Sequence, residues 1–334
     1  MAFAPDYRWW LVSLWAAAAL AVALLSPAGP PAGAPQISVT VGPDMTAYGI
    51  GRLLESKGLV RNGEVFAWYA RLRGIDDRLQ AGEYVFHQGL SIPALTAILA
   101  EGRSAFFRVT IPEGATLEEV AGYLAGAGLV TREEFLREAA SGTFPYDFLS
   151  DLPPGPRRLE GYLFPDTYYF TRRDGPHAIV DAMLGRFALE AESLDLPTRA
   201  ARLGLTVHEV LTVASMVEKE ARVAHERPVI AGVIYNRLAR GMPLQIDATV
   251  IYALGVNRGR VDYKDLEVAS PYNTYRVTGL PPGPIGAPGR ASLLAAVEPA
   301  ATPYLYYVAR PDGTHAFSIT LEEHNRYKRE YQGR

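Results

Sequence analysis

Two glutamates that end a long apolar segment are the residues best placed for acid–base chemistry. A capping-box pattern predicts a helix over residues 206–222. Residues 210–217 are almost entirely apolar, so most of this helix should be buried. Glu218 and Glu220 follow at the edge of the core, where partial loss of water raises the pKa of a carboxyl group toward neutrality. The alternative is an ordinary surface pair, such as Glu218 with Arg222, and periodicity does not choose between the two glutamates.

A second set of polar and aromatic residues follows in segments 244–252, 270–275 and 279–285. If the first segment is extended at its start, its alternating polar residues share one face. Aromatic faces combined with planar amides and carboxylates are typical of sugar-binding sites, whereas the prolines and glycines fit turns equally well. The candidates in these segments are Gln245, Asp247, Thr249, Tyr272, Asn273 and Tyr275.

Several other chemistries are disfavoured by composition and spacing. The chain has no cysteine and six scattered histidines, which argues against a catalytic metal. The His-Glu pairs at 208–209 and 225–226 lack a second histidine four positions later. Ser215 and Lys219 are four residues apart, whereas a penicillin-binding signature needs three. A net charge of −3 and an isoelectric point near 6.1 give no sign of nucleic-acid binding. We therefore expect carboxylate chemistry without a cofactor or metal.

The N-terminal region predicts a membrane anchor. Residues 9–25 form a 17-residue run without a charge, just long enough to cross a bilayer as a helix. Arg8 at its border favours a cytoplasmic N-terminus over residues 1–8 and an extracytoplasmic remainder. Residues 26–36, rich in proline and glycine, are typical of a semi-extended linker. The alternatives are a cleaved signal peptide or a buried helix.

An internal repeat with an offset of 70 residues organises the next part of the chain. Segments 39–41, 58–60 and 64–66 match segments 109–111, 128–130 and 134–136. Each copy predicts a strand, a Thr-capped helix and a second helix, and in the first copy residues 82–86 return as a strand. This β-α-α-β order resembles glycan-binding LysM-type modules and predicts such a module over residues 37–105. An ancestral duplication that serves as a spacer explains the repeat equally well.

The remaining residues, 106–334, predict a mixed α+β domain, so the expected fold class is α+β. Helices are expected at about 176–194, 206–222, 228–240 and 292–297. Residues 304–308 and 316–319 are expected to form a pair of strands, followed by a capped helix from Thr320.

Six segments in this domain resemble the MltG (YceG-like) family of endolytic murein transglycosylases. They are residues 159–168, 214–221, 235–238, 244–252, 272–283 and 304–325. The resemblance is close over residues 107–330, and the anchor and LysM-like module match the layout of the family. It implies cleavage of the β-1,4 bond between N-acetylmuramic acid and N-acetylglucosamine inside nascent glycan strands, leaving 1,6-anhydro ends. It also implies a single-pass protein of the plasma membrane, with peptidoglycan synthases as expected partners.

By the same resemblance, Glu218 is the catalytic acid and base. Its expected supporting or substrate-binding residues are Glu160, Tyr162, Asp166, Glu220, Asn236, Gln245, Asp247, Thr249, Tyr272, Asn273 and Tyr275. A peptidoglycan hydrolase would instead need a second carboxylate, which Glu160, Asp166, Glu220 or Asp247 can supply. A non-catalytic glycan-binding anchor is the third alternative, so the residues alone leave the reaction class open.

Overall fold

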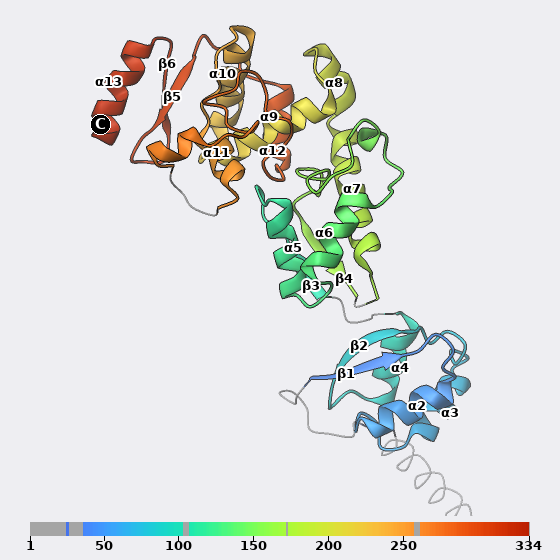
Figure 1. The fold of residues 1–334 in the computed structure, drawn as a ribbon. Coiled ribbons are helices and arrows are strands. Elements are labelled where there is room, and N and C mark those ends of the chain that lie inside the picture. Colours follow the sequence, from blue (N-terminus) through green and yellow to red (C-terminus); the bar gives the residue numbers. More distant parts are fainter. Residues whose placement is uncertain (1–24, 27–35, 103–106, 172, 257–260, 334) are drawn as a thin grey trace, which may run out of the picture. The chain divides into compact units, whose positions relative to one another are not determined.

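The computed structural model describes residues 25–26, 36–102, 107–171, 173–256 and 261–333. The chain forms two compact units, the first being Met1–Phe107 with Thr171–Arg173 and the second Arg108–Phe170 with Asp174–Arg334. Each unit has a hydrophobic core of its own. Short two-stranded sheets and many helices give a mixed α+β architecture, which confirms the predicted fold class (Figure 1).

In the residues that the structure describes, the first unit contains one two-stranded sheet and three helices. Its elements are β1 (Gln36–Val41), α2 (Ala47–Ser56), α3 (Gly63–Leu72), β2 (Gly82–His87) and α4 (Ile92–Ala100). The strands are antiparallel, with Val39 opposite Tyr84. Thr46, Asn62 and Ser91 cap the three helices with their side chains. The predicted β-α-α-β order is thereby confirmed, whereas glycan binding by this unit stays a prediction.

The second unit opens with a copy of the same pattern. Its first elements are β3 (Phe107–Thr110), α5 (Leu117–Gly126), α6 (Arg132–Ser141) and β4 (Thr167–Phe170), and β3 pairs with β4. Thr116 caps α5 as Thr46 caps α2, 70 residues earlier. In this copy the returning strand follows a short 3-10 helix (Asp147–Leu149) and a buried aromatic segment. The internal repeat is therefore a repeat of structure as well as of sequence.

The rest of the second unit is mainly helical (Figure 1). Its elements are α7 (Pro176–Ser193), α8 (Leu196–Arg202), α9 (Val207–Glu220), α10 (Arg227–Ala239), α11 (Asp247–Leu254), α12 (Arg290–Val297), β5 (Tyr306–Ala309), β6 (His315–Ser318) and α13 (Leu321–Gln332), with 3-10 turns at Ala224–Glu226 and Tyr263–Glu267. The antiparallel β5–β6 hairpin lies where a pair of strands is expected. Sequence periodicity missed α8, a seven-residue helix.

Helix α9 is the central element that positions the candidate site. Thr206 and Glu209 form the predicted capping box at its start. Residues 210–217 are all buried, as their apolar run predicts. The helix packs against α10 and α12. It ends at Glu220, two residues earlier than expected, because the backbone becomes extended at Ala221. Both candidate glutamates therefore belong to its last turn.

The predicted membrane span, residues 9–25, lies outside the described residues except for Leu25, and most of the predicted linker lies outside them too. Within the described ranges, no single helix is long and apolar enough to cross a membrane.

Candidate active site

Glu218 is held in a largely buried ion pair. One carboxylate oxygen lies 3.2 Å from Nη2 of Arg227, and the side chains are 7% and 14% exposed respectively. The other oxygen accepts a hydrogen bond from the backbone N–H of Gly289, at 3.0 Å. Arg227 is the first residue of α10 and Gly289 caps α12. Glu218 therefore pairs with Arg227 and not with Arg222. Its two contacts connect the end of α9 to the starts of α10 and α12.

A further carboxyl group, that of Glu113, shares this environment. A Cβ at position 289 would collide with it, so the glycine there permits the close approach. Burial and the charge of Glu218 raise the pKa of Glu113, while Arg227 opposes the shift. Two carboxyl groups therefore face one guanidinium group. Sequence reasoning missed Glu113, because it precedes Glu218 by more than a hundred residues and no local pattern connects them.

Glu220 has a different environment from Glu218. It is half-buried, and one of its carboxylate oxygens accepts a hydrogen bond of 3.1 Å from the hydroxyl of Tyr307 in β5. Burial raises the pKa of Glu220 to about 7, and the charge of Asp247 adds to this, whereas the Tyr307 hydrogen bond and Arg222 oppose it. A carboxyl group with a pKa near neutrality can both donate and accept a proton at physiological pH. Glu220 therefore meets the electrostatic requirement for general acid–base catalysis.

Asp247 is the charged group that faces Glu220 from α11. It is exposed, and its Oδ1 accepts a hydrogen bond of 2.6 Å from the hydroxyl of Tyr275. Asp247 is the first residue of its helix, and the residue before it, Ile246, is in an extended conformation. The predicted face of three alternating residues is wrong, because the segment turns into a helix at Asp247 and buries Thr249.

The turn before Asp247 is strained and firmly held. Gln245 has a φ of +53°, a conformation that residues other than glycine rarely adopt. Its backbone N–H donates to the carbonyl of Thr274, at 3.0 Å. Nη1 of the buried Arg237 donates to the carbonyls of Pro243 and Leu244 and to Oε1 of Gln245. Backbone strain of this kind persists only where its surroundings impose it, and it is concentrated at functional sites.

Glu160 occupies a second, deeper cluster of the same unit. One oxygen accepts from the backbone N–H of Leu117 at 2.9 Å and the other from the hydroxyl of Tyr252 at 2.8 Å. Burial raises the pKa of Glu160 to about 7. The guanidinium group of Arg157 lies over the rings of Tyr252 and Tyr272, 4.6 and 5.5 Å from their centroids. Glu160 thus joins α5 to α11 and is closed off from solvent.

The other predicted residues hold the fold together. They bond as follows: Tyr162 to His208, Asp166 to Arg186, Asn236 to the carbonyls of Thr302 and Tyr304, Thr249 to Thr274, and Asn273 to the carbonyls of Leu266 and Val268. Of the expected supporting residues, the structure therefore brings only Asp247 and Tyr275 to Glu220. It adds Tyr307, which sequence reasoning noted only as part of a strand.

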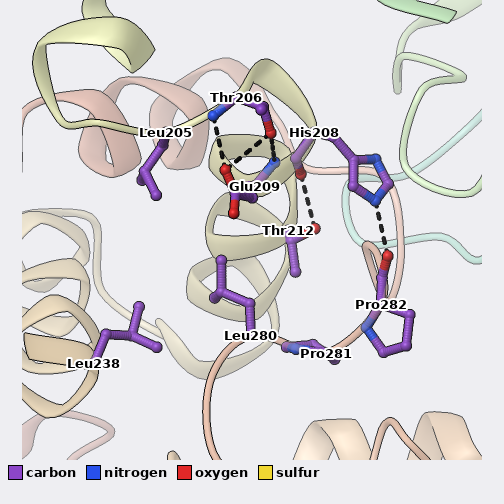
Figure 2. A pocket seen from close by; sticks show the side chains of 9 residues that line it. All are labelled: Leu205, Thr206, His208, Glu209, Thr212, Leu238, Leu280, Pro281 and Pro282. Atoms are coloured by element: carbon purple, nitrogen blue, oxygen red, sulfur yellow. Dashed lines mark hydrogen bonds between the residues drawn. The ribbon is translucent and has the colours of Figure 1, made fainter. Parts of the chain in front are cut away.

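An open pocket of about 600 Å³ lies at the opposite end of α9 (Figure 2). Its lining includes His208, Glu209 and residues 280–282, and His208 contacts the carbonyl of Pro282 at 2.9 Å. The helix has 14 residues and is therefore about 20 Å long. This pocket is consequently remote from Glu218 and Glu220. Among the described residues, no group of His, Asp and Glu side chains has the arrangement of a metal site.

Comparison with known proteins decides the family. The model of the YceG-like family matches residues 39–330. The chain belongs to the YceG-like family. The resemblance drawn from its motifs is thereby confirmed.

Its relatives carry a consistent name. A Bacillus subtilis (strain 168) protein named endolytic murein transglycosylase is 34% identical over 307 residues, covering 88% of this chain and 84% of the relative. A protein of the same name from Streptococcus pneumoniae serotype 2 is 34% identical over 305 residues; the match covers 83% of this chain and 55% of that longer relative. The crystal structure of a putative yceG-like protein from Listeria monocytogenes aligns with a TM-score of 0.61 at 34% identity, covering 87% of this chain and 98% of that one.

Proposed function

We propose that the chain is an endolytic murein transglycosylase. It cleaves the β-1,4 bond between N-acetylmuramic acid and N-acetylglucosamine within peptidoglycan strands and leaves 1,6-anhydro ends. Relatives of that name at 34% identity support the reaction class. The observation that carries the proposal is Glu220, a half-buried carboxyl group with a pKa of about 7 at the end of the central helix.

The proposed reaction uses one carboxyl group twice. Protonated Glu220 donates its proton to the glycosidic oxygen, and the bond from that oxygen to the anomeric carbon of the muramoyl residue breaks. The 6-hydroxyl oxygen of the same residue attacks the anomeric carbon, and its proton passes to the Glu220 carboxylate. The glutamate is regenerated and no water is consumed. An intramolecular nucleophile is effective because its effective molarity is very high.

The geometry favours Glu220 over Glu218 for this role. The resemblance assigns catalysis to Glu218, and that assignment stays a prediction. However, both oxygens of Glu218 are occupied, one by Arg227 and the other by the Gly289 N–H. A general acid must reach the leaving oxygen with a proton to donate. The two glutamates are similarly exposed, but Glu220 accepts a hydrogen bond from Tyr307 instead of pairing with an arginine, and its pKa is near neutrality.

A hydrolase is the second candidate, and one observation favours it. Asp247 is close enough to Glu220 for its charge to raise the pKa of that residue. Glycoside hydrolases use such a pair of carboxyl groups, one of which activates water or attacks the sugar. The two reactions give different products, since hydrolysis leaves a reducing end that is heavier by one water.

The cellular setting also belongs to the proposal. The uncharged run at residues 9–25 supports a single membrane anchor with the second unit outside the cytoplasmic membrane, where nascent glycan strands are found. Peptidoglycan synthases are the partners expected from the family layout.

Digestion of glycan strands by the full chain tests the proposed function. We expect products from within the strand that carry 1,6-anhydro ends, identified by mass spectrometry, and none from Glu220→Gln. Reducing ends from the wild type would favour the hydrolase. An absence of cleavage by folded wild type would leave a non-catalytic glycan-binding protein.

A further inference from the structure

The position of Asp247 is fixed by a hydrogen bond to its side chain and by contacts to the turn that precedes it. Tyr275 donates to its Oδ1 at 2.6 Å. Just before it, the backbone N–H of Ile246 donates to the hydroxyl oxygen of Thr274 at 3.0 Å. Gln245 adopts its positive φ in the same turn. Side chains and backbone from two separate segments therefore fix where this exposed carboxylate lies.

Arg237 donates hydrogen bonds to the backbone of the same turn. It is a buried cation whose guanidinium group donates to the backbone carbonyls of Leu305, Pro243 and Leu244. It thereby ties the turn before α11 to the strand region that carries Tyr307. Arg237 therefore helps to position both Tyr307, which donates to Glu220, and Asp247, which lies beside Glu220.

The groups around Glu220 come from several elements. Tyr307 donates to it from β5, and Asp247 faces it from α11. Arg222 follows it in the chain, and Tyr275 is close enough to feel its charge. Burial raises the pKa of the Tyr307 hydroxyl, and the positive charge of Arg237 opposes this shift. Asp247 is thus a negative group kept next to a carboxyl group that must hold a proton.

We propose that Asp247 is a second catalytic carboxylate, which faces the muramoyl anomeric carbon and stabilises the positive charge that develops there. The inference rests on the proposed function. When the glycosidic bond breaks, the departing oxygen takes the bonding electron pair and the proton of Glu220, and the anomeric carbon becomes cationic. A fixed carboxylate stabilises that charge without forming a bond, and the 6-hydroxyl then closes the anhydro ring.

The same residue has a second effect through Glu220. Its negative charge opposes ionisation of Glu220 and keeps the acid protonated at higher pH. Cleavage requires protonated Glu220, so the rate should fall as the pH rises through the pKa of Glu220. Removing the charge of Asp247 should move this fall to lower pH.

Asp247→Asn is the test, measured on glycan strands as kcat, KM and the pH dependence of the rate. We expect kcat to fall by about 10²–10³-fold, the usual loss when one group that stabilises transition-state charge is removed. We expect KM to change little and the high-pH fall to move to lower pH. Tyr307→Phe provides a control of opposite sign, because loss of its hydrogen bond should move the fall to higher pH. Tyr275→Phe should lower kcat in the same direction as Asp247→Asn, but by less.

The outcomes separate this inference from the proposed function. A folded Asp247→Asn protein that keeps its kcat, or that loses kcat with no change in pH dependence, overturns the role of Asp247. If Glu220→Gln is inactive in the same assay, the proposed function stands nevertheless. If Glu220→Gln remains active, the inference about Asp247 fails and the acid–base role returns to Glu218, whereas the reaction class is judged from the ends that the wild type produces. Asp312→Asn, at an exposed carboxylate in the β5–β6 turn, should match the wild type and so controls for charge loss alone.

Discussion

Separate substitution of the two glutamates in the last turn of α9 tests the assignment of the acid most directly. With its ordinary pKa of 4.5, Glu220 would be protonated in about 1 molecule in 300 at pH 7. With the raised pKa of about 7, Glu220 is protonated in about half of the molecules. Glu220→Gln removes both the transferable proton and the base. We expect a loss of at least about 10²–10⁴-fold in kcat, the usual worth of one acid–base step.

Glu218→Gln should instead affect stability. Removing one partner of a buried ion pair costs about 3–5 kcal/mol when the other charge is left uncompensated. Here Glu113 remains beside Arg227, and the new amide oxygen can still accept from the Gly289 N–H. We therefore expect a smaller loss of about 1–3 kcal/mol in the free energy of unfolding. The folded fraction should retain most of its cleavage activity.

The assay combines thermal unfolding with counting of anhydro ends per folded molecule. The expected pattern is an inactive, stable Glu220→Gln protein and an active, less stable Glu218→Gln protein. The reverse pattern would refute the reasoning from geometry and return the catalytic role to Glu218. Loss of activity in both variants, with normal melting temperatures, would mean that the two carboxyl groups act together.

Three further predictions follow from the structure and the chain. The pKa of Glu160 is about 7 in the folded state, so protonated Glu160 stabilises the fold fully below pH 4.5, and this stabilisation is lost as the pH rises through about 7. In urea unfolding from pH 4.5 to 8, Glu160→Gln should therefore reduce the fall in the free energy of unfolding by about 3 kcal/mol. The same pH dependence in the variant and the wild type would contradict this assignment. A reporter fused after residue 334 should behave as extracytoplasmic, and cytoplasmic behaviour would exclude the proposed access to the cell wall. Deletion of residues 37–105 should weaken cleavage of long strands more than of short oligosaccharides; equal loss on both would make this segment part of the catalytic fold.

Much of the fold can be predicted from short-range patterns. The capping box at Thr206 and the apolar run after it specify a buried helix, and both are properties of neighbouring residues. The repeat with an offset of 70 is visible because both copies keep the same cap before the same helix. Such signals need no knowledge of what lies across the core.

The site depends on contacts between distant parts of the chain. Glu218 meets Gly289 71 residues later, and Glu220 meets Tyr307 87 residues later. No spacing rule connects these positions. The alternation of polar residues around Asp247 predicted an extended segment, and this prediction failed for a related reason. Contacts from Thr274 and Arg237 hold Gln245 at a positive φ, so tertiary contacts override the strand pattern.

Helix geometry explains why the two glutamates have different environments. Successive residues of an α-helix are rotated by about 100°, so residues two apart point about 200° away from each other. Once Glu218 turns toward Arg227 and the start of α12, Glu220 must face the other side, where Tyr307 and Asp247 lie. The ion pair of Glu218 then fixes the rotation of the last turn, and with it the direction of the Glu220 carboxyl group. A stabilising residue and an acid–base residue can therefore be encoded within three positions, and their substitutions should separate stability from catalysis.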